Sequence, residues 1–570
     1  MTEASCPIGY VLGNKAASTL EYYVIVESGQ YLELDDVVYV DSQIDGYSGV
    51  TSVRFYGTVC EVSQYHEGIQ FDSDIQIVRQ GILPASTAYV GKVQVTQITP
   101  EIFVSPRPTD LVYRAKGAEL EDALSFARMA QRIPAGVMRN QQPFFINFEF
   151  LNGSKGAHAS ISGVSGVATK TTYALFLLYS LLHYEGTGAV PPPDRANAHL
   201  IAFNVKGEDM LFLDKPNRLL TERDNAIYQK MGLPMQPFDD LSFWAAPAEG
   251  LGPLTPATQQ RKDGVAPFCW TMREFAQEQL LPFLFADPDQ ETANMAGCIS
   301  SITARLEKKA EQDKGAWAGI RVGDRSITDL YTLIESLRED LDVADNERTW
   351  FDRIEHSATI HAFLRKLRLA AEALKNLVRS DVELPNPHKI DFDAHRLTVV
   401  HLSGLKPVAQ KFIVGSTLKR LMRQKEAQGA RPYYFLLLDE LNKYAPREGK
   451  SPIQDVLLDI AERGRSLGVI LIGCQQSASE VEKRILTNAS IKVNGRLDVA
   501  ESQSKEYDYL SGAFRVRSTI IKPGTMVLHQ PDIPAPVLVN FPMPAWATRR
   551  EEWAEDEELG HKVKEIFHRF

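Results

Sequence analysis

The sequence predicts an α/β protein in which a parallel sheet follows a small N-terminal β-barrel and is interrupted by a helical insertion. First, residues 198–205 form an almost continuous apolar run, which is typical of a strand covered on both faces of a sheet. Second, strands and helices alternate between residues 397 and 497, the order that builds parallel sheets with right-handed crossovers. Third, residues 6–114 contain short β-type runs separated by Gly, Asp and Ser turns, as in a small barrel.

Hydrophobic patterning places the other elements. Residues 116–139 are expected to form a linker and a helix, and residues 216–267, with seven prolines, to form loops and short strands. The helix of residues 173–184 is apolar nearly all round, so it should be buried against the sheet. Further predicted elements are strands 143–150, 397–402, 433–438, 469–474 and 490–497, helices 408–428 and 453–467, and edge strands 525–529 and 536–539.

Helical spacing of apolar residues marks the insertion. Leu330, Ile334, Leu337 and Leu341 recur at intervals of three and four, which places them on one face of a helix. The predicted parts are a barrel at 1–115, a first core part at 116–270, an inserted helical bundle at 271–385, a second core part at 386–545 and a helical tail at 546–570.

Composition narrows the class of protein. Of the 570 residues 44% are hydrophobic and 24% charged, which is typical of a soluble chain with two to four domains. The sequence has no apolar run long enough to cross a membrane and no secretory signal, so we expect a cytoplasmic protein with no membrane partner. Its scattered cysteines argue against a disulfide framework or a zinc site. They are Cys6, Cys60, Cys269, Cys298 and Cys474.

A stretch of small residues between a strand and a helix carries the first chemical signal. Residues 157–172 read Ala-His-Ala-Ser-Ile-Ser-Gly-Val-Ser-Gly-Val-Ala-Thr-Lys-Thr-Thr. Backbone N–H groups and a helix dipole would converge here, where a polyphosphate can sit. Lys170 would neutralise the β- and γ-phosphates of ATP, and the Thr171 hydroxyl would reach Mg²⁺. The predicted nucleotide-binding residues are Gly163, Val164, Ser165, Gly166, Val167, Ala168, Thr169, Lys170, Thr171 and Thr172.

This loop departs from the G-x-x-x-x-G-K-[ST] pattern at two points. Gly163 lies seven positions before Lys170, where the pattern has six, and Thr169 replaces the glycine before the lysine. A turn of small residues in an ordinary βα unit is the alternative interpretation. Gly163 and Gly166 could absorb the extra residue, since glycine tolerates backbone angles that other residues avoid.

An acidic pair closes a buried strand farther along the chain. The largely apolar residues 433–438 are followed by Asp439 and Glu440. Such a strand presents its carboxylates at the C-terminal edge of a sheet, as in a Walker B motif. Asp439 would hold Mg²⁺, usually through water, and Glu440 would polarise the attacking water. An acidic pair that caps the next turn is the alternative, but a phosphate loop in the same domain favours the catalytic interpretation.

Two segments carry a family resemblance. Residues 439–446 read Asp-Glu-Leu-Asn-Lys-Tyr-Ala-Pro, and residues 461–476 read Ala-Glu-Arg-Gly-Arg-Ser-Leu-Gly-Val-Ile-Leu-Ile-Gly-Cys-Gln-Gln. Together they resemble the HerA branch of the HerA/FtsK superfamily of RecA-like motor ATPases, over most of the chain. The resemblance implies a HAS-barrel, a RecA-like P-loop ATPase core with an inserted helical bundle, and a C-terminal strand brace. The patterning above gives the same order of parts.

The resemblance also implies roles for single residues. Gln475, at the tip of a core strand, would sense the γ-phosphate. Arg463 and Arg465 lie in a segment similar to the family's Ala-x-x-Gly-Arg, from which an arginine could reach the nucleotide of a neighbouring subunit. A solvated helix end is the alternative for both arginines.

Glu208 is a weaker catalytic candidate. Residues 206–208 are similar to the family's Asp-x-x-Gly-Glu segment near the nucleotide, but Asn204 stands where the Asp is expected. Three histidines lie in or beside core strands, where we expect a structural role rather than metal binding. They are His158, His199 and His401.

By resemblance, the expected function is a hexameric, ring-forming, Mg²⁺-dependent ATPase that moves double-stranded DNA through its pore as a translocase or helicase-like motor. An effector enzyme of nuclease or NADase type would dock on the N-terminal barrel, in DNA end processing or anti-phage defence. The altered phosphate loop favours defence. The net charge of −11 places DNA contact inside the ring rather than on its outer surface.

Two alternatives remain from the sequence. One is a hexameric scaffold that assembles and regulates an effector enzyme, with ATP hydrolysis secondary. The other is a motor for a different polymer, such as single-stranded nucleic acid or a conjugative substrate.

Overall fold

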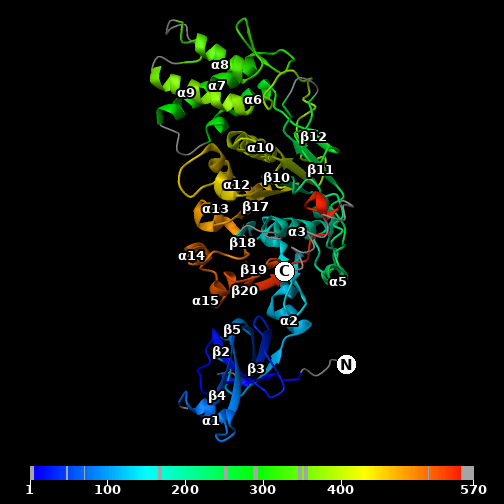
Figure 1. Ribbon diagram of the computed structural model, residues 1–570, viewed down its shortest axis with the longest axis vertical. Helices are drawn as coiled ribbons and strands as arrows, with labels where there is room; N and C mark the ends of the chain where they lie inside the picture. Colours follow the sequence, from blue (N-terminus) through cyan, green and yellow to red (C-terminus); the bar gives the residue numbers. More distant parts are fainter. Residues whose placement is uncertain are drawn as a thin grey trace.

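The computed structural model describes residues 6–46, 49–69, 71–164, 170–249, 254–286, 293–343, 349–351, 357–510 and 512–553. Figure 1 shows an elongated molecule with the barrel at one end, a layered α/β core in the middle and a group of helices at the other end. None of the helices in the described ranges combines the length and apolarity needed to span a bilayer.

The N-terminal strands close into a barrel by antiparallel pairing, in the order β1-β2-β5-β4-β3-β6. Side chains alternate between its interior and its surface, because successive residues of a strand face opposite sides. Tyr22, Val24 and Val26 of β2 point inward and join Val93 and Val112 in the interior. The predicted barrel is therefore confirmed. Its strands are β1 (Gly9–Val11), β2 (Glu21–Val26), β3 (Val37–Gly46), β4 (Gly49–Glu67), β5 (Ser86–Thr99) and β6 (Leu111–Arg114).

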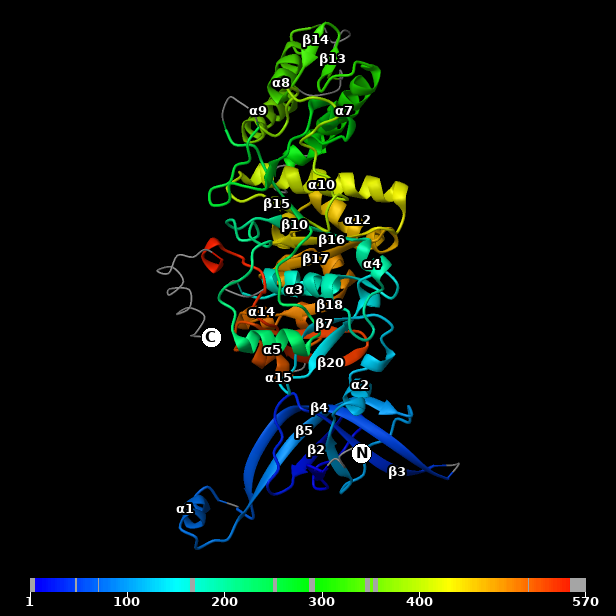
Figure 2. The ribbon, with the colours of Figure 1, turned by 90° about the vertical axis from the view of Figure 1, so that its right-hand side faces the viewer.

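Two of these strands project beyond the barrel. β4 and β5 continue as a pair toward the short helix α1 (Asp74–Arg79), which buries none of its residues. In Figure 2 this arm reaches away from the core. It exposes Phe71 and Ile82 by 66% and 70%, so it offers apolar surface for contacts outside the chain.

The barrel is fixed to the core through α15 (Gly512–Ser518). Arg517 on α15 donates from Nη1 and Nη2 to the two carboxylate oxygens of Asp35, at 2.7 and 2.6 Å. Both side chains are shielded from water, and Tyr39 and Tyr56 of the barrel share a hydrophobic cluster with the core. A bidentate arginine–carboxylate pair restricts both distance and orientation. The barrel therefore has a defined orientation on the core.

The core is built on a twelve-stranded sheet among the described residues, with the order β12-β11-β15-β10-β16-β17-β9-β18-β19-β20-β7-β8. Neighbours from β12 to β18 are parallel, and those from β18 to β8 are antiparallel. The strands of the parallel part are β9 (Ala157–Ser162), β10 (Ala198–Asn204), β11 (Leu241–Ala245), β12 (Val265–Pro267), β15 (Leu397–His401), β16 (Tyr433–Asp439), β17 (Val469–Gln475) and β18 (Ala489–Asn494).

Helices cover both faces of this sheet. Alternate residues of β10 join two clusters: Leu200 packs in the cluster that contains α3 (Lys170–His183), and Ile201 packs in the cluster that contains α10 (Pro407–Gln428). Strands buried on both faces are almost wholly apolar for this reason. Other helices of the core are α2 (Ala118–Ala123), α4 (Pro192–Ala196), α11 (Leu441–Tyr444), α12 (Pro452–Leu467), α13 (Lys483–Asn488) and α14 (Val499–Ser502).

The order of five neighbouring strands, β18-β9-β17-β16-β10, confirms the predicted RecA-like core. The strand that leads into the predicted phosphate loop, β9, is separated by a single strand, β17, from the strand that ends in the acidic pair, β16. All three are parallel, so their C-terminal ends lie at the same edge of the sheet.

The C-terminal strands do not lie at an edge, and that prediction was wrong. β19 (Thr525–Gln530) and β20 (Ile533–Asn540) are internal, because β20 pairs with β7 (Arg132–Val137), which in turn pairs with β8 (Pro143–Asn147). β7 also replaces the last part of the predicted linker and helix at 116–139. Gly136 is needed there, because a Cβ on it would lie 2.7 Å from the carbonyl oxygen of Asn540.

Residues 216–267 are more ordered than their proline content predicts. They include the helix α5 (Glu222–Lys230), whose N-terminus is closed by a capping box between Thr221 and Asp224. They also supply β11 and β12, which pair beyond β15 and form one edge of the parallel sheet. The prolines lie mainly between these elements and so do not prevent them.

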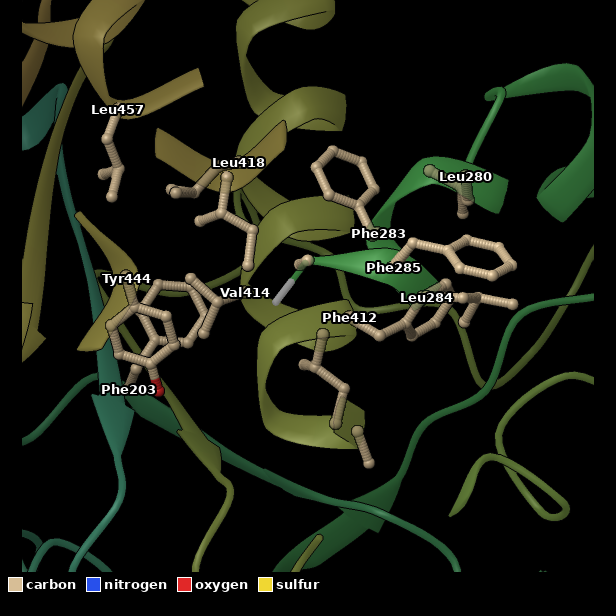
Figure 3. Packing of buried hydrophobic residues seen from close by; sticks show 14 of the residues in the cluster. Phe203, Leu280, Phe283, Leu284, Phe285, Phe412, Val414, Leu418, Tyr444 and Leu457 are labelled. Carbon is tan, nitrogen blue, oxygen red and sulfur yellow. The ribbon is translucent and has the colours of Figure 1, made fainter. Parts of the chain in front are cut away.

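The insertion between β12 and β15 forms the group of helices at the far end of the molecule (Figures 1 and 2). Figure 3 shows Phe283 and Leu284, from the 3₁₀ segment η3 (Leu281–Phe285), beside Phe412 and Val414 of α10. This contact joins the insertion to the core. The elements of the insertion include α6 (Met272–Gln277), α7 (Ala293–Gln312), β13 (Ile320–Val322), β14 (Arg325–Ile327), α8 (Leu330–Glu339) and α9 (Ser357–Ala373).

Gly415→Ala is expected to loosen this junction. A Cβ at Gly415 would lie 2.4 Å from the ring of Phe283, which is only 3% exposed and has little room to move. Overpacking of this kind costs about 1–3 kcal/mol of unfolding free energy, which exceeds the roughly 1 kcal/mol that alanine gains over glycine in a helix. Denaturant unfolding measures the change. The control is Gly297→Ala on α7, where a Cβ meets no atom within 4 Å and stability should not fall.

The predicted helical tail at 546–570 is described only to residue 553. Trp546 and Ala547 are buried in the core, and a 3₁₀ turn, η7 (Arg550–Glu552), follows. In this part the chain therefore packs on the core instead of beginning a helix at Trp546. Residues 554–570 lie outside the described part of the chain.

Candidate nucleotide site

The predicted phosphate loop connects the C-terminal end of β9 to the start of α3. Its first two residues are held by the neighbouring strands: the N–H of Gly163 donates to the carbonyl oxygen of Gln475 in β17 at 3.2 Å, and the N–H of Val164 donates to that of Arg496, just after β18, at 2.8 Å. Thr172 lies in the first turn of α3 and is partly buried. Five residues predicted to bind nucleotide lie outside the described part of the chain. They are Ser165, Gly166, Val167, Ala168 and Thr169.

Lys170 is buried at the start of α3 with its ammonium turned back onto the loop. Nζ donates to the carbonyl oxygen of Gly163 at 2.6 Å, and the residue is 2% exposed. Burial lowers the pKa of Lys170, although Asp439 opposes this shift. A buried cation with so little compensation would be stabilised by a phosphate group in the loop.

The side chains of Thr171 and Asp439 contact each other next to Lys170. The Thr171 hydroxyl donates to Oδ2 of Asp439 at 3.1 Å, across two elements separated by 268 positions in sequence. Hydroxyl and carboxylate oxygens are the ligands that Mg²⁺ takes beside substrate phosphates. No group of three His, Cys, Asp or Glu side chains in the described ranges could hold a metal alone. The pair therefore fits a Mg²⁺ that also needs oxygens from a nucleotide.

Glu440 lies just beyond the strand, in a left-handed backbone conformation with φ 56°. Such a conformation is costly for a residue with a Cβ and recurs at functional sites. Its side chain is 15% exposed and contacts two lysines: Lys206 at 3.5 Å, and Lys443. The strained backbone thus fixes a mostly buried carboxylate beside Asp439.

Lys206 is a site residue that the sequence analysis did not single out. Its Nζ donates to Oδ2 of Asp439 at 3.0 Å and lies near Glu440. Burial opposes the charge of Lys206, but the two carboxylates outweigh burial and raise its pKa. The sequence signal was its position, two residues after β10, which is the neighbour of β16 in the sheet.

Lys206→Gln is expected to make folding more dependent on Mg²⁺. Removal of the ammonium leaves Asp439 and Glu440 repelling each other, so stability without Mg²⁺ should fall by about 1 kcal/mol for a partly exposed pair, and Mg²⁺ should restore more stability than in the parent. Thermal unfolding with and without Mg²⁺ measures both effects. Lys443→Gln is the matched control, because among the described residues Lys443 forms an ion pair with Glu440 but none with Asp439. Equal responses of the two variants to Mg²⁺ would contradict the prediction.

Gln475 ends β17 at the base of the phosphate loop. Its Nε2 donates to the hydroxyl oxygens of Ser160 and Ser162 at 2.7 and 3.2 Å, and its backbone carbonyl accepts from the N–H of Gly163 at 3.2 Å. The Oε1 atom is buried with no hydrogen-bond partner in the described chain. An unpaired amide oxygen at this position could accept a hydrogen bond from a water beside the γ-phosphate.

Glu208 is engaged elsewhere. Its carboxylate accepts hydrogen bonds from the backbone N–H groups of Gln259, Gln260 and Arg261, including one of 2.8 Å from Gln260. In the described chain it makes no ion pair or hydrogen bond with Lys170 or the acidic pair. The structure therefore shows Glu208 as an anchor of a neighbouring loop, and its catalytic role stays a prediction.

Arg463 and Arg465 lie at the opposite edge of the sheet, near the end of α12. Arg465 donates to the carbonyl oxygens of Gly153 and Ser154 at 2.8 and 2.7 Å, just before β9 begins. Lys170 follows the other end of β9, so a strand of about 20 Å separates these arginines from it. Arg463 forms ion pairs with Asp459 and Glu426. Neither arginine reaches the site of its own chain.

Three core histidines have structural contacts. Nδ1 of His158 accepts from the N–H of Leu471 at 2.9 Å, and burial lowers the pKa of His158 to about 4, so it is neutral. His401 lies 3.2 Å from the side-chain amide of Asn204. His199 contacts the carbonyl oxygen of a residue before β15 at 3.0 Å.

Several solved structures are similar in fold. The structure of VirB4 of Thermoanaerobacter pseudethanolicus is 14% identical, with 74% of this chain and 98% of that chain covered and a TM-score of 0.46. The plasmid coupling protein TrwB in complex with GDPNP is 13% identical, with 78% and 96% covered and a TM-score of 0.46. The genome packaging NTPase B204 from Sulfolobus turreted icosahedral virus 2, in complex with sulfate, is 13% identical, with 26% and 69% covered and a TM-score of 0.21. No protein-family model and no curated protein sequence matches this chain.

Proposed function

We propose that this protein is a Mg²⁺-dependent ATPase of the motor type. The observation that carries the proposal is the meeting of Thr171 with Asp439 at 3.1 Å, beside the buried Lys170, at the C-terminal edge of a RecA-like sheet. Lys170 binds the phosphates, Glu440 orients the attacking water, and Gln475 accepts from that water. Mg²⁺, held by Thr171 and Asp439, supplies neutralisation of charge on the phosphate oxygens.

In the same proposal six copies form a ring around double-stranded DNA. Arg463 and Arg465 lie far from the site of their own chain, which supports a role at a neighbouring subunit's nucleotide. The ring closes by repeating one heterologous contact. An effector enzyme of nuclease or NADase type docks on the barrel, and the exposed Phe71 and Ile82 of its arm support a contact there. Anti-phage defence or DNA end processing is the setting.

Two measurements test the motor. Mass in solution should correspond to six chains, and ATP turnover should rise when duplex DNA is added. A strictly monomeric protein, with and without nucleotide, would contradict both the ring and the arginines acting between subunits. A hexamer whose ATP turnover does not change when DNA is added would contradict the proposed motor but would still be consistent with an ATPase.

A scaffold that assembles and regulates an effector is the second candidate. It is favoured by the contact of Lys206 with both Asp439 and Glu440, since this cation competes for the carboxylates that Mg²⁺ and water need. The departures of the phosphate loop from the usual pattern point the same way. If Lys206 restrains hydrolysis in this way, turnover should be slow in the parent and should rise in Lys206→Gln; turnover that Lys206→Gln leaves unchanged would speak against this argument for the scaffold.

A further inference from the structure

A pocket of about 140 Å³, lined by apolar side chains together with several charged and hydroxyl-bearing ones, lies beside the candidate nucleotide site. Ser160 and Ser162 of β9 form part of its wall, together with residues of β18, α13 and the turn η6 (Lys505–Tyr507). Ala159 and Ile161 of β9 pack in the cluster of α3, so the two serines that alternate with them face the other side of the sheet. In Figure 1, α13 and β18 lie next to each other on the left of the molecule, on the side away from α5.

Three lysines line this pocket. Lys483 and Lys505 are exposed, whereas Lys492 is partly buried with its ammonium 5.5 Å from the ring centre of Tyr509. In the part of the chain that the structure describes, none of the three forms an ion pair with a carboxylate. The pocket therefore gathers positive charge that the chain does not balance.

The surroundings of Lys492 confirm this imbalance. Its partner in register on β19 is His529, itself a base, and burial lowers the pKa of both side chains. Nδ1 of His529 is buried with no partner in the described chain. The carboxylate that lines the pocket, Glu506, is already engaged by Arg447 at 2.7 Å. A partly buried ammonium without a counter-charge is stabilised by an anionic ligand.

We propose that this pocket binds a phosphate group. The three lysines supply point charges for its oxygens, and the hydroxyl groups of Ser160 and Ser162 can donate hydrogen bonds from the wall. The phosphate is either part of a nucleic-acid backbone or free inorganic phosphate, since both present the same tetrahedral anion.

The pocket and the nucleotide site share one strand end. Gln475 donates to Ser160 and Ser162, and Ser162 directly precedes Gly163, whose carbonyl oxygen accepts from Lys170. A phosphate in the pocket therefore acts on the residues that hold the phosphate loop. Assigning the phosphate to a nucleic-acid backbone rests on the proposed function, whereas the proposal that the pocket binds a phosphate group does not.

The test uses the full chain and two probes. In the first arm, inorganic phosphate is titrated calorimetrically into Lys170→Ala protein, which removes phosphate binding at the nucleotide site, with and without Lys492→Gln. In the second arm, protein without nucleotide is titrated into a short, fluorescently labelled DNA duplex at several salt concentrations. The affinity read from the anisotropy of the DNA is compared between the parent and the double variant Lys483→Gln/Lys505→Gln. Lys308→Gln, exposed on α7, is the control in both arms.

Pocket variants should bind at least one probe about tenfold more weakly, as expected for lost charged hydrogen bonds, while Lys308→Gln matches the parent. Loss for inorganic phosphate alone identifies a free anion. Loss for DNA, with the salt slope reduced by about one for each phosphate contact removed, identifies the backbone. Folded variants that bind both probes like the parent would overturn the proposal.

If Lys492→Gln does not fold, the variants of the two exposed lysines decide in both arms. Failure of the parent to bind ATP would remove the proposed function and leave this test intact.

Discussion

Glu440→Gln is expected to bind ATP as the parent does and to hydrolyse it about 10²–10⁴-fold more slowly, the range for a lost general base. The substitution keeps the size of a side chain that is 15% exposed and held in a left-handed turn, so the site should stay folded. What is lost is the charge that orients and deprotonates the attacking water. A fall in turnover at constant nucleotide affinity is the pattern of an interaction made in the transition state.

Turnover and nucleotide affinity are measured separately, under single-turnover conditions and by equilibrium titration. Glu480→Gln is the matched control, since Glu480 is an exposed acid at the C-terminal side of β17 that contacts Asn442 at 3.1 Å. It should behave like the parent. Unchanged hydrolysis in Glu440→Gln would mean that another group activates the water.

Lys170→Ala is expected to weaken nucleotide binding by about 10–100-fold, the effect of one charged hydrogen bond. In the described structure the ammonium contacts only the carbonyl oxygen of Gly163, so its loss leaves one carbonyl without a donor and no unpaired acid. The substitution should therefore reduce the free energy of unfolding by less than it reduces the free energy of nucleotide binding. Equilibrium titration with a fluorescent ATP analogue checks the affinity, and thermal unfolding checks the fold.

Lys155→Ala controls for the loss of a lysine near the same strand. Lys155 lies before β9, at the opposite end from the phosphate loop, and pairs with Glu149 at 2.7 Å. It should bind nucleotide like the parent. If Lys170→Ala did the same, the nucleotide would have to bind elsewhere.

The core strands could be predicted from sequence because burial on both faces leaves a plain signal. β16 and β17 differ from their predicted ranges by one residue at the C-terminal end, where Asp439 and Gln475 are polar although buried. Those two residues were recognised instead as candidates for chemistry. A polar residue that ends an apolar strand can thus still belong to the buried strand, and its place in the candidate site stays a prediction.

Other features depend on contacts that no local pattern records. β7 contains Pro134 and Gly136, which weaken a strand signal, and its partner β20 begins almost 400 positions later. Lys206 became a site residue only through the adjacency of β10 and β16. The sequence placed it at a strand end, but the pairing with Asp439 needs the order of the sheet.

The pairing of β20 with β7 also has a consequence for synthesis of the chain. The barrel uses residues 9–114 and can close early, whereas the core sheet joins residues from both ends, as in the bond from the N–H of Asn147 to Oε1 of Gln530, 383 positions apart. Contacts between distant positions form late, and unpaired strands expose apolar edges meanwhile. The core sheet, which carries the candidate site, can therefore be completed only after β20 (Ile533–Asn540) has been synthesised, whereas all barrel strands are available once residue 114 has been made.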